Sequence, residues 1–261
     1  MSLLDSIPFP VEVPYAMRPH MQPWTPDQPL LSTDQDFDRY ITEKKSLYGP
    51  VYGNNVSREL LSSAIEALKK YSPGLPVDPQ ADGPVYNLTM NLQEDFVIWA
   101  PNADGDLSAQ VLSVCFPSGW APEEKVNMTF QDIHEPVPDF DTVRKASGMI
   151  ARMITEKGPF VRHVWAVSNT GNLSRHPSQC PEWNSQTLDD MWFRCERQVT
   201  VPIDGQAALF LIRVYVTPLK TVFEDTEKKQ KIVAAINSMS DAVMDYKNAW
   251  YLRDYLNQHA V

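Results

Sequence analysis

Apolar and polar residues follow two different periods along this chain, and the two periods predict helices and strands. Apolar residues recur three and four positions apart over 34–71, Asp139–Lys157 and Thr221–His259, which is typical of one face of a helix. Glu94–Ala100 and Leu107–Phe116 are instead rich in strand-forming residues and flank a turn rich in Asp, Asn and Gly. The pattern predicts helices around a sheet that contains at least one hairpin.

A second hairpin is predicted from Trp192–Val201 and Gln206–Thr217. Asp204-Gly205 lies between these segments and is a preferred pair for a two-residue type I′ turn. A turn of that length fixes the pairing of the two strands and places Glu196 directly opposite Arg213. Another strand is predicted just before this hairpin, over 160–167.

The face of the second hairpin that carries Glu196 is predicted to be the wall of a pocket. The same pairing puts Arg194 and Arg213 beside Glu196, among side chains too apolar for an ordinary solvated surface. A carboxylate between two guanidiniums can stay ionised and orient a cationic ligand, or the arginines can bind the carboxylates of a cofactor. A structural cross-strand ion pair is the alternative interpretation. The opposite face, with Val199 and Val214, is predicted to be core.

Proline divides the chain into two unequal parts. The 22 prolines cluster in the first thirty residues and again over 73–84, and proline disfavours helix interiors and central strands. We therefore expect residues 1–33 to form an irregular proline-rich arm and residues 34–261 to form a single domain. A length of 261 residues is sufficient for one large core.

Charge and composition narrow the possible partners and the compartment. The chain has 23 basic and 33 acidic residues, a formal net charge of -10, which disfavours a broad surface for nucleic acid or anionic lipid. No apolar run approaches the ~20 residues that span a bilayer, and no secretory signal or transit peptide is evident. Three cysteines do not make a disulfide framework. We expect a cytoplasmic protein.

The local signals for nucleotide and metal chemistry are few. The sequence contains no GxGxxG, no phosphate-binding loop, no HExxH and no GxSxG, so the chain is not expected to bind NAD(P)H by itself. His134 precedes Pro136 and Pro138, which would fix the backbone beside an imidazole. A fixed imidazole suits a metal ligand, although capping a turn is the alternative. His163 lies in the middle of a predicted strand, where a core histidine is the ordinary interpretation.

An ordered set of motifs spans about 91–219 and includes the strand around Trp165. In chain order the other motifs are Gln93-Glu94-Asp95, Ser113-Val114-Cys115-Phe116-Pro117-Ser118-Gly119-Trp120, Glu124-Lys125, Ile133-His134-Glu135-Pro136-Val137-Pro138, Arg194-Cys195-Glu196-Arg197-Gln198 and Ile212-Arg213-Val214-Tyr215-Val216-Thr217-Pro218-Leu219. This ordered set resembles the haem-dependent oxidative N-demethylase α-subunit-like family.

The resemblance implies an α+β fold, namely a PAS-like antiparallel sheet flanked by helices that binds haem b. It makes His134 the candidate for the proximal iron ligand. It does not fix the roles of the polar residues; we expect Glu196 and Arg213 to be catalytic groups, and Arg194 and Arg213 to contact the haem carboxylates. The implied reaction is an O2-dependent demethylation of a small secondary amine such as dimethylamine. Electrons would come from a separate reductase that carries FMN, a 2Fe-2S cluster and NADPH.

Departures from the family pattern leave alternatives open. Cys115 or His163 is an alternative axial ligand, although Cys115 follows an apolar run and is more simply a buried core thiol. A haem-binding gas or redox sensor would use His134 without needing Glu196. A cofactor-free interaction protein would keep the fold alone.

Overall fold

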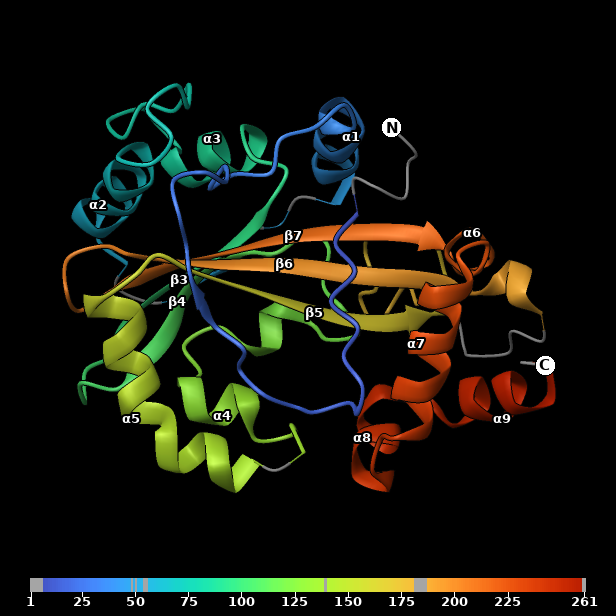
Figure 1. Ribbon diagram of the computed structural model, residues 1–261. Helices are drawn as coiled ribbons and strands as arrows, with labels where there is room; N and C mark the ends of the chain where they lie inside the picture. Colours follow the sequence, from blue (N-terminus) through green and yellow to red (C-terminus); the bar gives the residue numbers. More distant parts are fainter. Residues whose placement is uncertain are drawn as a thin grey trace.

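Within the residues that the computed structural model describes, 7–259 apart from 48, 50, 54–55, 139 and 181–186, seven strands form one antiparallel sheet (Figure 1). Their order across the sheet is β1-β5-β6-β7-β3-β4-β2. The strands are β1 Gln22–Pro23, β2 Val51–Tyr52, β3 Asp95–Pro101, β4 Leu107–Ser113, β5 Phe160–Ser168, β6 Trp192–Pro202 and β7 Ala208–Pro218. Both predicted hairpins and the predicted strand over 160–167 are therefore present, and the α+β class is confirmed.

Helices cover both sides of this sheet. They are α1 Phe37–Leu47, α2 Arg58–Lys69, α3 Pro84–Met90, α4 Phe130–His134, α5 Phe140–Glu156, α6 Leu219–Phe223, α7 Thr226–Asn237, α8 Asp241–Lys247 and α9 Trp250–His259. In Figure 1, α1, α2 and α3 lie on one side of the strands, and α4 and α5 lie on the other. In the described part of the chain, no helix is both long enough and apolar enough to cross a membrane.

Two of the predicted helical stretches are divided in the structure. The stretch 34–71 contains α1 and α2 with the short strand β2 between them, and Thr221–His259 contains the end of α6 and the whole of α7, α8 and α9. In the C-terminal stretch, Asp225 caps the N-terminus of α7 and Ser240 caps that of α8, while Asn248 ends α8 in the left-handed conformation at φ 49°. These capping residues interrupt an apolar period that continues through them. Asp139, the predicted first residue of the middle helix, lies outside the described residues.

The pairing of the second hairpin differs from the predicted one by a single residue. Glu196 pairs with Val214, and Arg213 pairs with Arg197. The prediction that Glu196 lies opposite Arg213 is therefore wrong. Because side chains alternate along a strand, a slip of one residue moves every side chain of β7 to the other face.

The turn between β6 and β7 explains the slip. Ile203 N donates to Ala207 O at 2.9 Å, so three residues, not two, lie inside the last hydrogen-bonded pair. Asp204 Oδ1 accepts hydrogen bonds from the backbone N of Gln206 and of Ala207, both at 2.9 Å. An aspartate that binds the backbone two and three residues ahead stabilises this longer turn.

The strand pairings define two faces of the sheet. Face A carries Val199 and Leu211, and face B carries Glu196 and Val214. On face A the sheet packs against α2 and α3 at one end and against α7, α8 and α9 at the other. On face B it packs against α4 and α5, and against the loop residues Phe116 and Leu173. The predicted core face is thus divided, because Val199 lies on face A and Val214 on face B.

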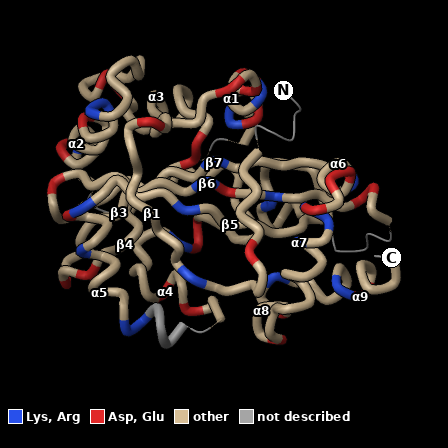
Figure 2. Tube along the Cα trace, viewed as in Figure 1, with Lys and Arg blue, Asp and Glu red and all other residues tan. Residues whose placement is uncertain are grey.

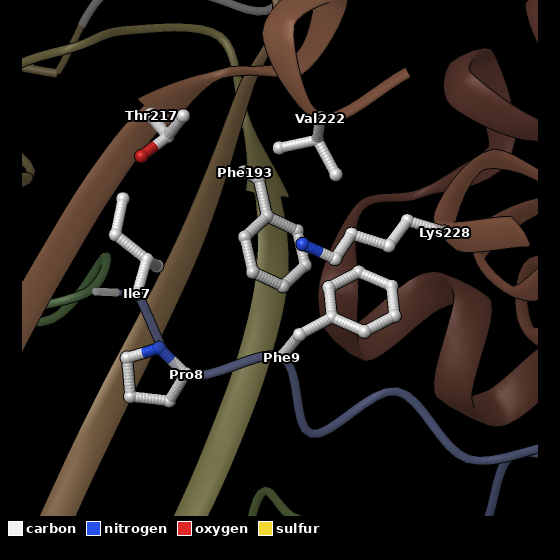
Figure 3. Close-up of a pocket in the computed structure, with 7 residues that line it drawn as sticks. All are labelled: Ile7, Pro8, Phe9, Phe193, Thr217, Val222 and Lys228. Atoms are coloured by element: carbon white, nitrogen blue, oxygen red, sulfur yellow. The ribbon is translucent and has the colours of Figure 1, made fainter. Parts of the chain in front are cut away.

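The proline-rich arm follows the sheet over a long distance. Val11 and Leu30 are buried in the two clusters of face A, and β1 pairs with the first residues of β5. Near the described start of the chain, Ile7, Pro8 and Phe9 lie beside Phe193 (Figure 3). The Phe9 and Phe193 rings are 5.5 Å apart. The arm is thus irregular but packed, and the division of the chain at 33/34 stays a prediction.

Candidate functional site

Glu196 occupies a part-exposed position of face B and is held at both carboxylate oxygens. The Ser118 hydroxyl donates to Oε1, and Gln198 Nε2 donates to Oε2 at 2.7 Å. Gln198 lies two residues along β6 and therefore on the same face, whereas Ser118 comes from the loop after β4. Two neutral donors thus fix the orientation of one carboxylate.

Arg194 positions Ser118. Its Nε donates to Ser118 Oγ at 2.7 Å, and its two terminal nitrogens donate to Leu173 O at 2.8 Å and Phe116 O at 2.9 Å. The side chain is 2% exposed, and burial lowers its pKa to about 10. Arg194 is therefore a buried cation that joins two loops and places the hydroxyl beside Glu196.

Arg162 occupies the corresponding place on the other side of Glu196. It lies on β5 directly beside Gln198, and its Nε donates to Gln198 Oε1 at 2.5 Å. Burial lowers the pKa of Arg162, and the charge of Glu196 opposes that shift. Face B therefore carries a row in the order Arg162, Gln198, Glu196, Ser118 and Arg194. We call it the Glu196 row.

His134 is the last residue of the short helix α4, whose N-terminus is capped by Thr129. This helix packs on face B, the face that carries Glu196. His134 Nδ1 lies 2.7 Å from Phe130 O, and the two rings pack at 4.2 Å. A carbonyl only accepts, so Nδ1 carries the proton and Nε2 keeps its lone pair. Burial lowers the pKa of His134, and the charge of Arg162 lowers it further, against the effect of the bond to Phe130. The imidazole is thus neutral near pH 7 and oriented.

Arg213 lies on face A and does not join Glu196. Its Nη2 donates to Asp34 Oδ2 at 2.7 Å, Nη1 to Val214 O at 3.0 Å and Nε to Ser32 O at 3.3 Å. The guanidinium also lies 3.8 Å above the Tyr40 ring. The structure therefore brings Glu196 and Arg194 together through Ser118, but it separates both from Arg213.

The alternative ligands differ from His134 in their surroundings. Cys115 is 6% exposed, and burial together with nearby Asp95 raises the pKa of its thiol to about 12. His163 is on face A, where burial and then Arg197 lower its pKa. A protonated thiol is a poor metal ligand at neutral pH, since the thiolate is the ligating form.

Four residues of the site were not among the predicted site residues. Ser118 and Gln198 lie within the quoted motifs, and alternation along β6 already placed Gln198 on the face of Glu196. Arg162 is on β5, and the long connection to β6 prevents counting its pairing from the sequence. Lys247 of α8 donates to Trp165 O at 2.9 Å, and burial lowers its pKa to about 8 against the opposing charge of Glu196.

Charged residues of both signs are spread along the trace, and several of them lie on the central strands β5 to β7 (Figure 2). The charged residues of the Glu196 row thus lie in a protein whose positive and negative charges are mixed along the chain.

A family model described as "haem-dependent oxidative N-demethylase, alpha subunit-like" matches residues 64–257. The match contains His134 and the whole Glu196 row, and it is wider than the 91–219 region of the motifs. It covers well over half of the chain, from α2 into α9. The description names haem dependence, oxidative N-demethylation and one subunit of a larger assembly. The chain therefore belongs to the haem-dependent oxidative N-demethylase, alpha subunit-like, family.

Proposed function

We propose that this chain is the haem-binding subunit of an enzyme that removes a methyl group from a small secondary amine, such as dimethylamine, with O2 as the oxidant. The observation that carries the proposal is the Glu196 row together with His134. The row holds an oriented, part-exposed carboxylate, and the oriented, neutral imidazole of His134 lies on the same side of the sheet.

His134 fits the requirement for a haem ligand. A ligating histidine commonly donates its other ring N–H to a carbonyl, which fixes the tautomer and directs the lone pair. The bond from His134 Nδ1 to Phe130 O meets that condition and leaves Nε2 for the iron. When bound, haem b would supply an iron centre that binds and activates O2.

The residues of the chain would bind and orient the amine. A small secondary amine is a cation near neutral pH, so the Glu196 carboxylate is a complementary partner for its N–H groups. Ser118 and Gln198 each occupy one lone-pair direction of that carboxylate, which leaves the remaining directions for the substrate. Because both donors are tied to arginines, the carboxylate would hold the amine in one orientation.

The overall reaction requires an external source of electrons. One oxygen atom of O2 would go into the methyl carbon, which leaves as formaldehyde, and the other would leave as water. The balance needs two electrons and two protons. We propose a partner reductase that carries NADPH, FMN and a 2Fe-2S cluster, as the α-subunit description suggests a further subunit.

Arg194 and Arg213 have a smaller part in this proposal. Each donates from its terminal nitrogens to partners within the chain. Contact of either arginine with haem carboxylates, and a catalytic role for Arg213, stay predictions.

The absorption spectrum of protein expressed with a haem supply tests the proposal. We expect a Soret band that shifts on reduction and addition of carbon monoxide, and that is lost or strongly altered in His134→Ala. His163→Ala is the matched control, because His163 is on face A, and it should keep the wild-type spectrum. A spectrum that depends on His163 or on Cys115, or no specific haem binding at all, would overturn the assignment of His134.

A further inference from the structure

A cavity of about 360 Å³ lies between the proline-rich arm and the edge of β5. It is lined by arm residues between Pro10 and Gln28 and by Val161–Trp165 of β5. Small-molecule sites commonly measure ~300–1,000 Å³. His134 and Glu196 do not line it, and its arm wall lies outside the region that the family model matches. We call it the arm cavity.

The arm cavity has two permanently charged basic side chains against one acidic side chain. The lining includes Arg18 and Arg162 against a single acid, Glu12, together with His20 and His163. Glu12 lies 3.6 Å from His20 Nε2. The two guanidiniums, which are always charged, therefore make the cavity attractive to an anion.

Arg162 has hydrogen-bonding capacity that the other arginines of the central strands lack. In the described residues, Arg194, Arg197 and Arg213 all donate from both terminal nitrogens to carbonyl or carboxylate oxygens. Arg162 uses its Nε alone, toward Gln198. The two terminal nitrogens have no hydrogen-bond partner within the described chain and stay accessible, so they can donate to an anion.

The open edge of β5 supplies a further donor. Trp165 O accepts from Lys247 Nζ, so the odd-numbered residues of β5 direct their backbone groups away from β6. The arm strand β1 pairs only as far as Val161. The backbone N–H of His163 therefore faces the arm cavity beside Arg162.

The rest of the lining is suited to a small apolar body. Tyr15 and Trp165, on the face A side of β5, meet edge to face with ring centroids 6.0 Å apart, and Met17 lies on the arm side. Arg162 is on face B, so the ligand would lie across the open edge of β5 to contact both. We propose that the arm cavity binds the carboxylate group of a small organic acid, with Arg162 and the His163 N–H as its main donors, Arg18 as a second cation and the aromatic rings against its apolar part.

This proposal shares Arg162 with the Glu196 row, but it does not rest on the demethylase activity and can be tested on haem-free protein. The probes are benzoate and its uncharged analogue benzyl alcohol, and binding is measured by titration calorimetry. We expect benzoate to bind at least about tenfold more tightly than benzyl alcohol, because only benzoate carries a negative charge and two oxygens that can accept parallel bonds from a guanidinium. Equal affinity for the two probes would overturn the proposal.

Variants locate the binding. Arg162→Met should weaken benzoate binding by about tenfold or more and leave benzyl alcohol unchanged, whereas Arg162→Lys should give an intermediate loss because it keeps the charge without the fork. Arg18→Met, at an exposed position, should cost about threefold and cannot be attributed to a folding defect. Arg39→Met on α1 is the matched control, since Arg39 is exposed and pairs with Glu43. Unchanged benzoate binding in both Arg18→Met and Arg162→Lys contradicts the assignment.

The carboxylate could belong to a free acid or to haem itself, and a competition experiment separates these sources. If haem carboxylates occupy the arm cavity, haem-loaded protein should no longer bind benzoate, and haem dimethyl ester should not compete. If the ligand is a separate acid, haem-loaded and haem-free protein should bind benzoate equally. His134→Ala should leave benzoate binding to the haem-free protein unchanged, so failure of the haem assignment would not affect this test.

Discussion

The two faces of the β6–β7 hairpin use the same residue types in different ways. On face A, Arg213 contacts Asp34 directly at 2.7 Å and lies over the Tyr40 ring, with 0% of the residue exposed. On face B, no arginine of the described chain bonds directly to Glu196, because Ser118 and Gln198 lie between. In the direct pair, the charge of Arg213 is balanced by Asp34. The neutral donors Ser118 and Gln198 instead orient the Glu196 carboxylate and leave its charge available to a ligand. Arg213 therefore serves to stabilise the fold, which we call an anchor, whereas Glu196 is arranged to bind a ligand.

The largest expected effect is on the stability of face A. Arg213→Met should lower the free energy of unfolding by about 2–3 kcal/mol, since it removes hydrogen bonds to Asp34 and to two carbonyls around a buried position. Urea unfolding followed by circular dichroism measures the change, with Arg39→Met as the control. A loss below about 0.5 kcal/mol would mean that Arg213 is not an anchor.

The next effect is on activity at face B. Glu196→Gln keeps the shape of the side chain but removes its charge, so turnover of the amine should fall by about a hundredfold, in the range seen when one electrostatic group is removed. Stability should change by less than about 1 kcal/mol, because the residue is part-exposed. Unchanged turnover in Glu196→Gln with normal haem content would contradict the catalytic role of Glu196. A protein that binds haem and gas but never turns over amine, in wild type as in the variant, would favour the sensor.

A smaller effect is expected from the spacer between Glu196 and Arg194. Ser118→Ala removes one donor to Glu196 and one acceptor for Arg194, so kcat/KM should fall by about tenfold while haem binding stays normal. Steady-state kinetics measure the loss, and Ser46→Ala on α1 is a control with an exposed hydroxyl. A loss as large as that of Glu196→Gln would show that the row acts as one unit.

The smallest effect concerns pH. A protonated imidazole cannot bind iron, so haem affinity should fall as pH drops through the pKa of His134. Burial and Arg162 hold that pKa below its ordinary value of 6.5, so the loss at pH 6.5 should be less than about twofold and its midpoint should lie below that pH. Haem titrations at several pH values measure the midpoint. A midpoint above 6.5 would contradict the environment described for His134.

The sequence predicted the elements more reliably than their pairing. The first hairpin and β5 lie where they were predicted, because segments rich in strand-forming residues and the turn between the first two are local signals. The second hairpin was also predicted, but Asp204 binds the backbone of Gln206 and Ala207 and adds one residue to the turn. That single residue moved Arg213 to the face opposite Glu196. The apolar period of the C-terminal stretch similarly did not show the helix ends at Asp225, Ser240 and Asn248.

The sequence by itself determined the α+β class, the family, and the position of His134 and Glu196 as candidate residues, because periodicity and ordered motifs are local properties of the chain. Only the tertiary structure decided which groups meet. Arg162 reaches the Glu196 row through the β5–β6 pairing, and Ser118 reaches it through a distant loop. The arm cavity lies beyond Val161, where the pairing of β1 with β5 ends. These contacts join residues far apart in the chain, and their geometry depends on long connections whose conformation no local pattern specifies.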